Sequence, residues 1–158
     1  MATHPLTGRD ETEAERVDRN LQEFLGELRV ALPGVQVLFA FLLVVPFNQR
    51  FSDITDFQKT TYFVTLLFTA AASVCLIAPT AQHRIEFRRQ HKEQILLMAN
   101  RLAVLGLGCL AVAMTGAILL ITDLLYGSTT TLIVTLAVGV AFATLWYLVP
   151  VRRLVADR

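Results

Sequence analysis

Four long apolar stretches, separated by charged segments, constrain this chain most. The hydrocarbon core of a bilayer is about 30 Å thick, so a helix needs about 20 residues to cross it. Four segments approach this length without a charged residue, at about residues 30–47, 60–78, 102–121 and 132–149. The sequence therefore predicts an all-α fold, a four-helix transmembrane bundle.

The composition agrees with a chain that lies mostly inside a membrane. Hydrophobic residues make up 54% of the 158 residues and charged residues 17%, whereas soluble domains carry about 45–50% and about 25%. We expect one transmembrane domain over residues 30–149, because four spans form one compact bundle. Residues 1–11 are expected to be a disordered tail and 150–158 a short second tail.

Four prolines lie near the ends of the predicted spans. Pro33 fits the first turn of a helix, where a proline is tolerated. Pro46, Pro79 and Pro150 fall at or just past the end of a span. Because a proline disrupts a helix interior, Pro46, Pro79 and Pro150 are expected to stop or bend a helix.

The lysines and arginines predict the orientation. Only two of the 14, Arg50 and Lys59, lie in the first connection, and the third connection has none. The rest lie in or near the two tails and in the middle connection, residues 79–101, which we call the basic loop. The positive-inside rule then predicts a multi-pass protein of the cell (plasma) membrane with both termini in the cytoplasm.

An amphipathic helix is predicted ahead of the first span, over residues 12–32. Its apolar residues recur at intervals of three and four, as on one face of a helix: Val17, Leu21, Phe24, Leu25, Leu28 and Leu32. The run Thr12-Glu13-Ala14-Glu15 resembles a capping box that would begin it. Residues 9–29 carry seven acids and four arginines, so this helix is acidic.

The basic loop is a candidate docking surface. Arg84, Arg88 and Lys92 share one helical face with His91 adjacent to it, and Arg89 is a further candidate docking residue of the loop. Such a face attracts anionic lipid headgroups, although the same residues would serve equally as topology determinants. A third interpretation is that the acidic helix of the same chain, or of a neighbouring protomer, docks on this face.

The predicted spans contain no ionisable residue, and such residues usually mark ion coupling or substrate binding in a membrane. Asp123 and Arg101 lie at opposite ends of the third span and are read as interfacial anchors. No histidine lies in a span to ligate haem, and Ser73 has no basic residue in its span to activate it. Cys75 and Cys109 lie in apolar stretches, and we interpret both as packing residues. We expect no catalytic residue, cofactor or metal site.

Small and hydroxyl residues form helical stripes in three spans. They are Thr65, Thr69 and Ser73 in the second, Gly106, Cys109, Ala113 and Ala117 in the third, and Thr131, Thr135, Gly139 and Ala143 in the fourth. Such stripes let helices approach closely in lipid, within one bundle or between protomers. Alternatively, Thr65, Thr69, Ser73, Thr135 and Gly139 line a pore, as polar residues do in channels.

Three segments resemble a family of uncharacterised small four-span membrane proteins of actinobacteria. They are ELRVALPGVQVLFAFLLVVPF, YFVTLLFTAAASVCLIAPTAQHRIEFRR and ANRLAVLGLG, within about residues 20–120. The resemblance implies the four-span fold and no established activity. Some members carry the label sodium:proton antiporter, which the resemblance would extend to this chain.

Two classes of function follow as expectations. The first is a non-enzymatic, oligomeric module that conducts ions or small solutes, or that scaffolds a membrane complex. The alternative is a secondary transporter such as a cation:proton antiporter. It ranks second because antiport uses a carboxylate inside the membrane, and no predicted span contains one. The expected partners are anionic lipid headgroups and either further copies of the chain or another membrane protein. Nucleic acid is not an expected partner.

Overall fold

The computed structural model describes residues 13–85 and 92–156, which are helical apart from short connections. The long helices are α1 (Glu13–Val44), α2 (Asp56–Ile85), α3 (Lys92–Leu125) and α4 (Ser128–Ala143). Two 3-10 turns, η1 (Val45–Phe47) and η2 (Gln49–Asp53), connect α1 to α2. A π-helical turn, η3 (Thr144–Leu148), continues α4 into α5 (Val149–Ala156).

Four stretches are long and apolar enough to cross a membrane, which confirms the predicted four-helix transmembrane fold. They are Gln22–Phe47, Asp56–Gln82, Leu97–Leu125 and Ser128–Arg152. Helices α1, α2 and α3 contain 32, 30 and 34 residues, or about 45–51 Å at 1.5 Å per residue. These three helices are therefore longer than the hydrocarbon core is thick.

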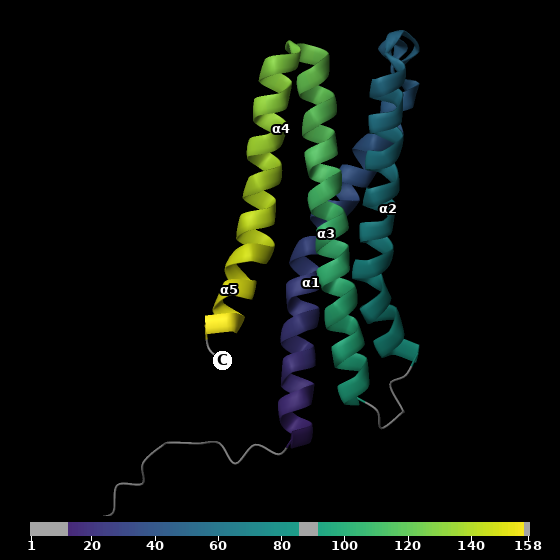
Figure 1. Cartoon of the computed structure of the whole chain (residues 1–158). Helices are drawn as coiled ribbons and strands as arrows, with labels where there is room; N and C mark the ends of the chain where they lie inside the picture. Colours follow the sequence, from purple (N-terminus) through teal and green to yellow (C-terminus); the bar gives the residue numbers. More distant parts are fainter. Residues whose placement is uncertain (1–12, 86–91, 157–158) are drawn as a thin grey trace, which may run out of the picture.

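The helices pack as a compact group of three with a fourth at one side. Figure 1 shows α2, α3 and α4 in order across the molecule, with α1 beside the lower half of α3. The backbone of α1 approaches both α2 and α3. Within the described residues, α4 approaches α3 but neither α1 nor α2. The beginning of α1 and the end of α5 point to the same end of the molecule (Figure 1).

Two apolar clusters hold the group of three together. The larger one joins α1, α2 and α3 through the buried residues Leu28, Val35, Ala72, Leu76, Ala103 and Leu110. The smaller one joins Leu42, Tyr62 and Leu120 near the other end. There the Tyr62 hydroxyl donates a hydrogen bond to the Leu42 carbonyl at 2.9 Å. Because lipid is itself apolar, close van der Waals packing rather than water exclusion stabilises the contacts within the membrane.

Helix α1 runs without a break through Pro33, where the sequence placed a new helix entry. The predicted amphipathic helix 12–32 and the first span are one continuous helix in this region. Pro33 has no N–H, so the Arg29 carbonyl lacks its usual helical hydrogen bond. The boundary at residue 32 between the amphipathic helix and the first span therefore rests on polarity alone. The predicted disordered tail, residues 1–11, lies outside the described residues.

Two other prolines also lie inside continuous helix. Pro79 is inside α2, which runs on to Ile85. Pro150 follows the π-helical turn, in which the Val149 N–H donates to the Thr144 carbonyl five residues earlier. This wider turn separates the Pro150 ring from the preceding carbonyls, with which it would clash in a regular helix. Pro46 alone of these positions coincides with a helix end, because α1 stops at Val44 and η1 follows.

Candidate functional site

The hydroxyl stripe predicted on α2 lies at the α2–α3 interface. Thr65 is 2% exposed and Thr69 is fully buried. The hydroxyls of Thr65, Thr69 and Ser73 donate to the carbonyls four residues earlier, at 2.7, 2.8 and 2.9 Å. Each polar atom is therefore satisfied within its own helix.

Two glycines of α3 allow α2 to approach closely. A Cβ atom at Gly116 would overlap the Thr65 Oγ1 atom, and one at Gly106 would lie 2.8 Å from the Leu76 Cγ atom. Neither space accepts a side chain unless the neighbouring side chain, Thr65 or Leu76, shifts. Both glycines therefore set the distance between the two helices, as small residues do in membrane proteins.

These positions favour packing over pore lining for the α2 stripe within one chain. Ala113, from the predicted α3 stripe, is also fully buried, while Cys109 and Ala117 are partly buried. Buried hydroxyls bonded to their own helix offer no path for water. Pore lining by Thr65, Thr69 and Ser73 stays a prediction for an oligomer.

The stripe predicted on α4 lies on the side that packs against α3. Thr131 is 4% exposed, and its hydroxyl donates to the Gly127 carbonyl at 3.2 Å. The Thr135 Oγ1 atom is buried and has no hydrogen-bond partner among the described residues. A Cβ at Gly139 would meet the Thr115 Cγ2 atom at 3.7 Å, an ordinary contact. The α3–α4 interface is therefore looser at Gly139 than the α2–α3 interface is at Gly116.

A groove of about 760 Å³ lies along the α3–α4 interface, and we call it the lateral groove. Helix α3 lines it with one face from Val104 to Leu119, and Phe68 of α2 contributes to it. Helix α4 and the π-helical turn line the other side with Gly139, Phe142, Ala143 and Tyr147. Its volume lies within the range of about 300–1,000 Å³ that is usual for ligand sites. No sequence pattern indicated this groove.

Tyr147 crosses the lateral groove at one end. Its hydroxyl donates to the Val104 carbonyl of α3 at 2.9 Å. A Cβ on Gly108 would lie 2.8 Å from the Tyr147 oxygen, so Gly108 leaves the space that this hydroxyl occupies. Tyr147 belongs to the π-helical turn. The π-helical turn before Pro150 therefore also carries Tyr147, whose hydrogen bond to Val104, the polar tie, links the end of α4 to α3.

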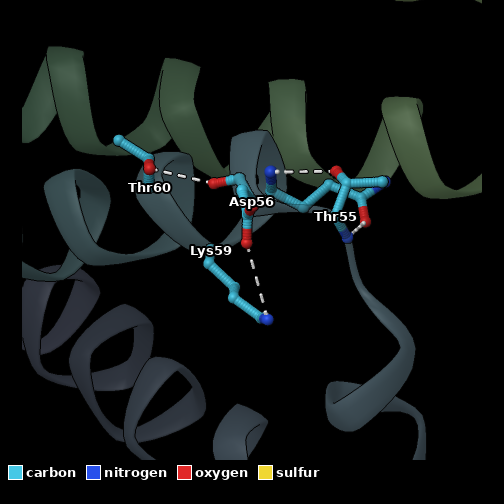
Figure 2. Close-up of polar contacts among 5 residues, drawn as sticks. Thr55, Asp56, Lys59 and Thr60 are labelled. Carbon is cyan, nitrogen blue, oxygen red and sulfur yellow. Dashed lines mark hydrogen bonds and ion pairs between the residues drawn. The ribbon is translucent and has the colours of Figure 1, made fainter.

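A polar cluster links the beginning of α2 to the end of α3. The Thr55 backbone N–H donates to the Gln58 Oε1 atom at 3.0 Å, and the Gln58 N–H donates to the Thr55 hydroxyl at 3.3 Å. The Gln58 Nε2 atom donates to the Asp123 Oδ2 atom at 2.8 Å. Nearby, Lys59 lies 3.7 Å from the Asp56 carboxylate and Thr60 donates to the Asp56 carbonyl, as Figure 2 shows.

Gln58 is a structural residue that the sequence analysis missed. It is 9% exposed and links α2 to α3 through Asp123, which lies 65 residues further along the chain. The run Thr55-Asp56-Phe57-Gln58 has the spacing of a capping box, and this pattern could have indicated the capping role of Gln58. Asp123, predicted as an interfacial anchor, is partly buried and bonded to Gln58, whereas Arg101 is exposed.

The candidate docking residues of the basic loop cannot be placed. Arg88 and Arg89 lie outside the described residues, as do the side chains of Arg84 in α2 and Lys92 in α3. The acidic part of α1 lies beside the start of α3, where Glu23, Glu27 and Asn100 line a hollow of about 340 Å³. The predicted partners of the basic loop, lipid headgroups or the acidic helix, stay predictions.

The chemistry available to the described residues is limited. No three histidine, cysteine, aspartate or glutamate residues of residues 13–85 and 92–156 with described side chains come together as a metal site. Cys75 and Cys109 are free thiols. The features that distinguish the described part are thus the close α2–α3 packing, the lateral groove and the Gln58–Asp123 pair.

Four apolar helices of membrane-spanning length, packed side by side, define a multi-pass helical membrane protein. Comparison of the sequence with known families refines this class. The chain belongs to a family of unknown function, DUF6328, which matches residues 10–150. This agrees with the resemblance to an uncharacterised family. No curated protein and no solved structure matches the chain.

Proposed function

We propose that this protein is a non-enzymatic module of the cell membrane that forms a homo-oligomer and scaffolds a membrane complex. The observation that carries the proposal is the exposure of α4. Its one buried residue is Thr131, and within the described part of the chain it packs against α3 alone. Most of its circumference is available to another transmembrane helix, so α4 is the proposed assembly helix.

The chemistry of the described spans supports a role without catalysis. The Ser73 hydroxyl, the serine considered above as a nucleophile, donates to the Thr69 carbonyl. A catalytic serine instead needs an adjacent general base. The partly buried carboxylate of Asp123 is bonded to an amide and not to a reactive partner.

The proposed orientation places both termini in the cytoplasm, and the lysine and arginine distribution supports it. A reporter that is active only in the cytoplasm, fused after residue 158, should be active. The same reporter fused into the connection between α3 and α4, near Gly127, should be inactive. The reverse pattern would contradict the orientation.

Oligomeric state and ion flux together test the scaffold proposal. The protein would be purified in a mild detergent, its mass measured by light scattering, and ion flux recorded after reconstitution into vesicles. We expect an oligomer that shows no flux. A monomer in the detergent and in cross-linked native membranes would contradict it.

Conduction by an oligomer is a second candidate, because the Thr135 Oγ1 atom is buried without a hydrogen-bond partner in the described part of the chain. Single cysteines at Thr65, Thr69 and Thr135, in a chain with Cys75 and Cys109 replaced by alanine, test it. A pore predicts reaction with a membrane-impermeant thiol reagent at all three positions. Under the scaffold proposal all three resist the reagent.

A cation:proton antiporter is the remaining candidate, and Asp123 is the observation that favours it. This carboxylate lies inside the third candidate span, two residues before its last residue, and accepts a hydrogen bond from Gln58. Antiport predicts sodium-driven proton flux in vesicles that Asp123→Asn abolishes. Under the scaffold proposal neither the natural chain nor this variant shows such flux.

A further inference from the structure

The lateral groove between α3 and α4 has the shape of a site for an extended apolar chain. From Val104 to Leu119 it follows α3 for about 22 Å at 1.5 Å per residue. This exceeds the thickness of one leaflet's hydrocarbon, about half of the 30 Å core. Gly108, Gly116 and Gly139 are among its lining residues, and Phe68 and Tyr147 wall it. It lies within the candidate spans, so hydrocarbon and not water surrounds it.

The charges at the two ends of the groove have opposite signs. Arg101 lies one helical turn before Val104, on the same α3 stripe as the groove residues Leu105, Gly108 and Val112. Arg101 is exposed, and its side chain makes no hydrogen bond or ion pair with another residue of the described ranges. At the other end, Asp123 lies one turn beyond Leu119.

A second arginine lies at the same end as Arg101. Arg152 follows Tyr147 by five residues on the helix that forms the other wall, and it is exposed. Since the Tyr147 hydroxyl bonds to the Val104 carbonyl, these two positions mark the same height along α3 and α4. Both helices therefore continue from the groove toward a cationic residue.

We propose that the lateral groove binds one acyl chain of an anionic phospholipid, whose phosphate lies near Arg101 and Arg152. The apolar walls accept the chain, and the arginines attract the headgroup as cations near a membrane surface do. The carboxylate of Asp123 repels a phosphate at the opposite end, so the charges also determine the direction of the lipid. Tyr147 lies at the boundary between chain and headgroup, a depth at which tyrosine is common.

Photolabelling of the full chain in vesicles tests this proposal. The vesicles contain phosphatidylcholine and a small fraction of phosphatidylglycerol that carries a diazirine in one acyl chain. We expect labelled peptides from the groove face of α3 and from residues 139–147. The same diazirine on phosphatidylcholine should label this site less. Equal labelling of all lipid-facing helices, with no preference between the two lipids, would overturn the proposal.

Two alanines of α4 provide a matched pair. Ala143 lines the groove, while Ala141 is exposed and does not line it. Ala143→Phe fills the groove and should lower its labelling about five-fold, which corresponds to about 1 kcal/mol of overpacking. Ala141→Phe should leave it unchanged. Equal labelling of the two variants would contradict binding in the groove.

Arg101→Gln tests the headgroup contact separately from the chain contact. Loss of one cation should reduce the preference for phosphatidylglycerol over phosphatidylcholine about five-fold, equivalent to about 1 kcal/mol. Labelling by the phosphatidylcholine probe should persist, since the apolar walls are intact. An unchanged preference in both Arg101→Gln and Arg152→Gln would refute the headgroup assignment.

Cys109 provides a measurement that does not depend on filling the groove. It lines the groove and is the remaining thiol in Cys75→Ala. Its reaction with N-ethylmaleimide should be slower in vesicles with phosphatidylglycerol than in phosphatidylcholine alone. An equal rate, or a Cys109–Cys109 disulfide between two copies, would overturn the proposal, the second by showing that another copy fills the groove.

Discussion

Helix α3 makes two interfaces, and they differ in how closely the partner helix approaches. Against α2, Gly116 leaves no space for even a Cβ atom beside Thr65. Against α4, a Cβ on Gly139 would make only an ordinary contact with Thr115, and a groove of about 760 Å³ follows the interface. Both interfaces contain glycines and threonines, so composition does not explain the difference. The difference lies in the middle of the two interfaces, at Gly116 and Gly139, because at the end of the α3–α4 interface Gly108 also faces a side chain closely, that of Tyr147.

The two interfaces also differ in whether their buried hydroxyls have hydrogen-bond partners. The buried hydroxyls of α2 bond to their own backbone, whereas the buried oxygen of Thr135 on α4 has no described partner. Among the described side chains, Gln58 donates to Asp123 across the α2–α3 interface, and Tyr147 donates to the Val104 carbonyl across the α3–α4 interface. In lipid, such contacts and close packing decide which helices stay together.

The largest expected effect comes from Gly116→Ala. The new methyl group overlaps the Thr65 oxygen, and overpacking costs about 1–3 kcal/mol, more than the gain of up to about 1 kcal/mol in helix propensity. Thermal unfolding in detergent should show a lower midpoint.

Gly139→Ala makes the same chemical change at the looser interface and is the matched control. It should leave the midpoint unchanged or raise it. Thr65→Ala combined with Gly116→Ala should recover much of the loss, because the overlapping oxygen is absent. Equal midpoints for Gly116→Ala and Gly139→Ala would show that the two interfaces do not differ.

Gln58→Leu should have the next largest effect. It removes the bond that the Gln58 side chain accepts from the Thr55 N–H and the bond that it donates to the Asp123 carboxylate, at a combined cost of about 1–2 kcal/mol. The free energy of unfolding in mixed micelles measures it. Asp123→Asn retains an acceptor for the Gln58 amide and should cost less; an equal or larger loss would contradict the assigned bond.

Tyr147→Phe removes the polar tie of the α3–α4 interface. Side-chain hydrogen bonds between membrane helices contribute about 0.6 kcal/mol on average, so we expect a small loss of stability. Cysteines placed on α4 and α3 near the tie, with spin labels attached, should show a broader distance distribution. An unchanged distribution would show that the hydroxyl does not hold α4 in place.

The smallest effects come from Thr69→Val and Thr135→Val, a pair with the same change of side chain. Thr69 loses a satisfied hydrogen bond to the Thr65 carbonyl, and we expect a cost below about 1 kcal/mol. Thr135 loses a buried hydroxyl that has no partner within residues 13–85 and 92–156, so its replacement should be neutral or stabilising. Comparison of the two unfolding midpoints tests the pair, and a larger loss at Thr135 would indicate a partner from another protomer.

Much of the fold was predictable because the relevant signals are local. Hydropathy located all four spans, although the helices run several residues further at most ends. The prolines misled, since α1 and α2 continue through Pro33 and Pro79. A bilayer favours helical backbone strongly enough to accommodate a missing N–H, and neighbouring helices help to satisfy the freed groups.

The candidate site was less predictable, because it depends on which surfaces meet. The stripes containing Thr65 and Gly116 were visible as small residues at helical spacing, but nothing local indicated that they contact each other. Gln58 carried a capping signal without any sign of its distant partner, Asp123. The lateral groove exists only because α4 diverges from the close packing that α2 and α3 achieve.

The sequence by itself determined the number of spans, the helical class and the absence of ionisable residues from the span centres. A membrane requires every backbone hydrogen bond to be made within a segment, so those properties follow from each stretch alone. Only the tertiary structure decided that α2 packs closely on α3, that α4 stands apart beside a groove, and that Tyr147 and Gln58 tie the helices. Those outcomes depend on van der Waals contacts between residues far apart in the chain, and apolar lipid gives the helices no hydrophobic preference for one another.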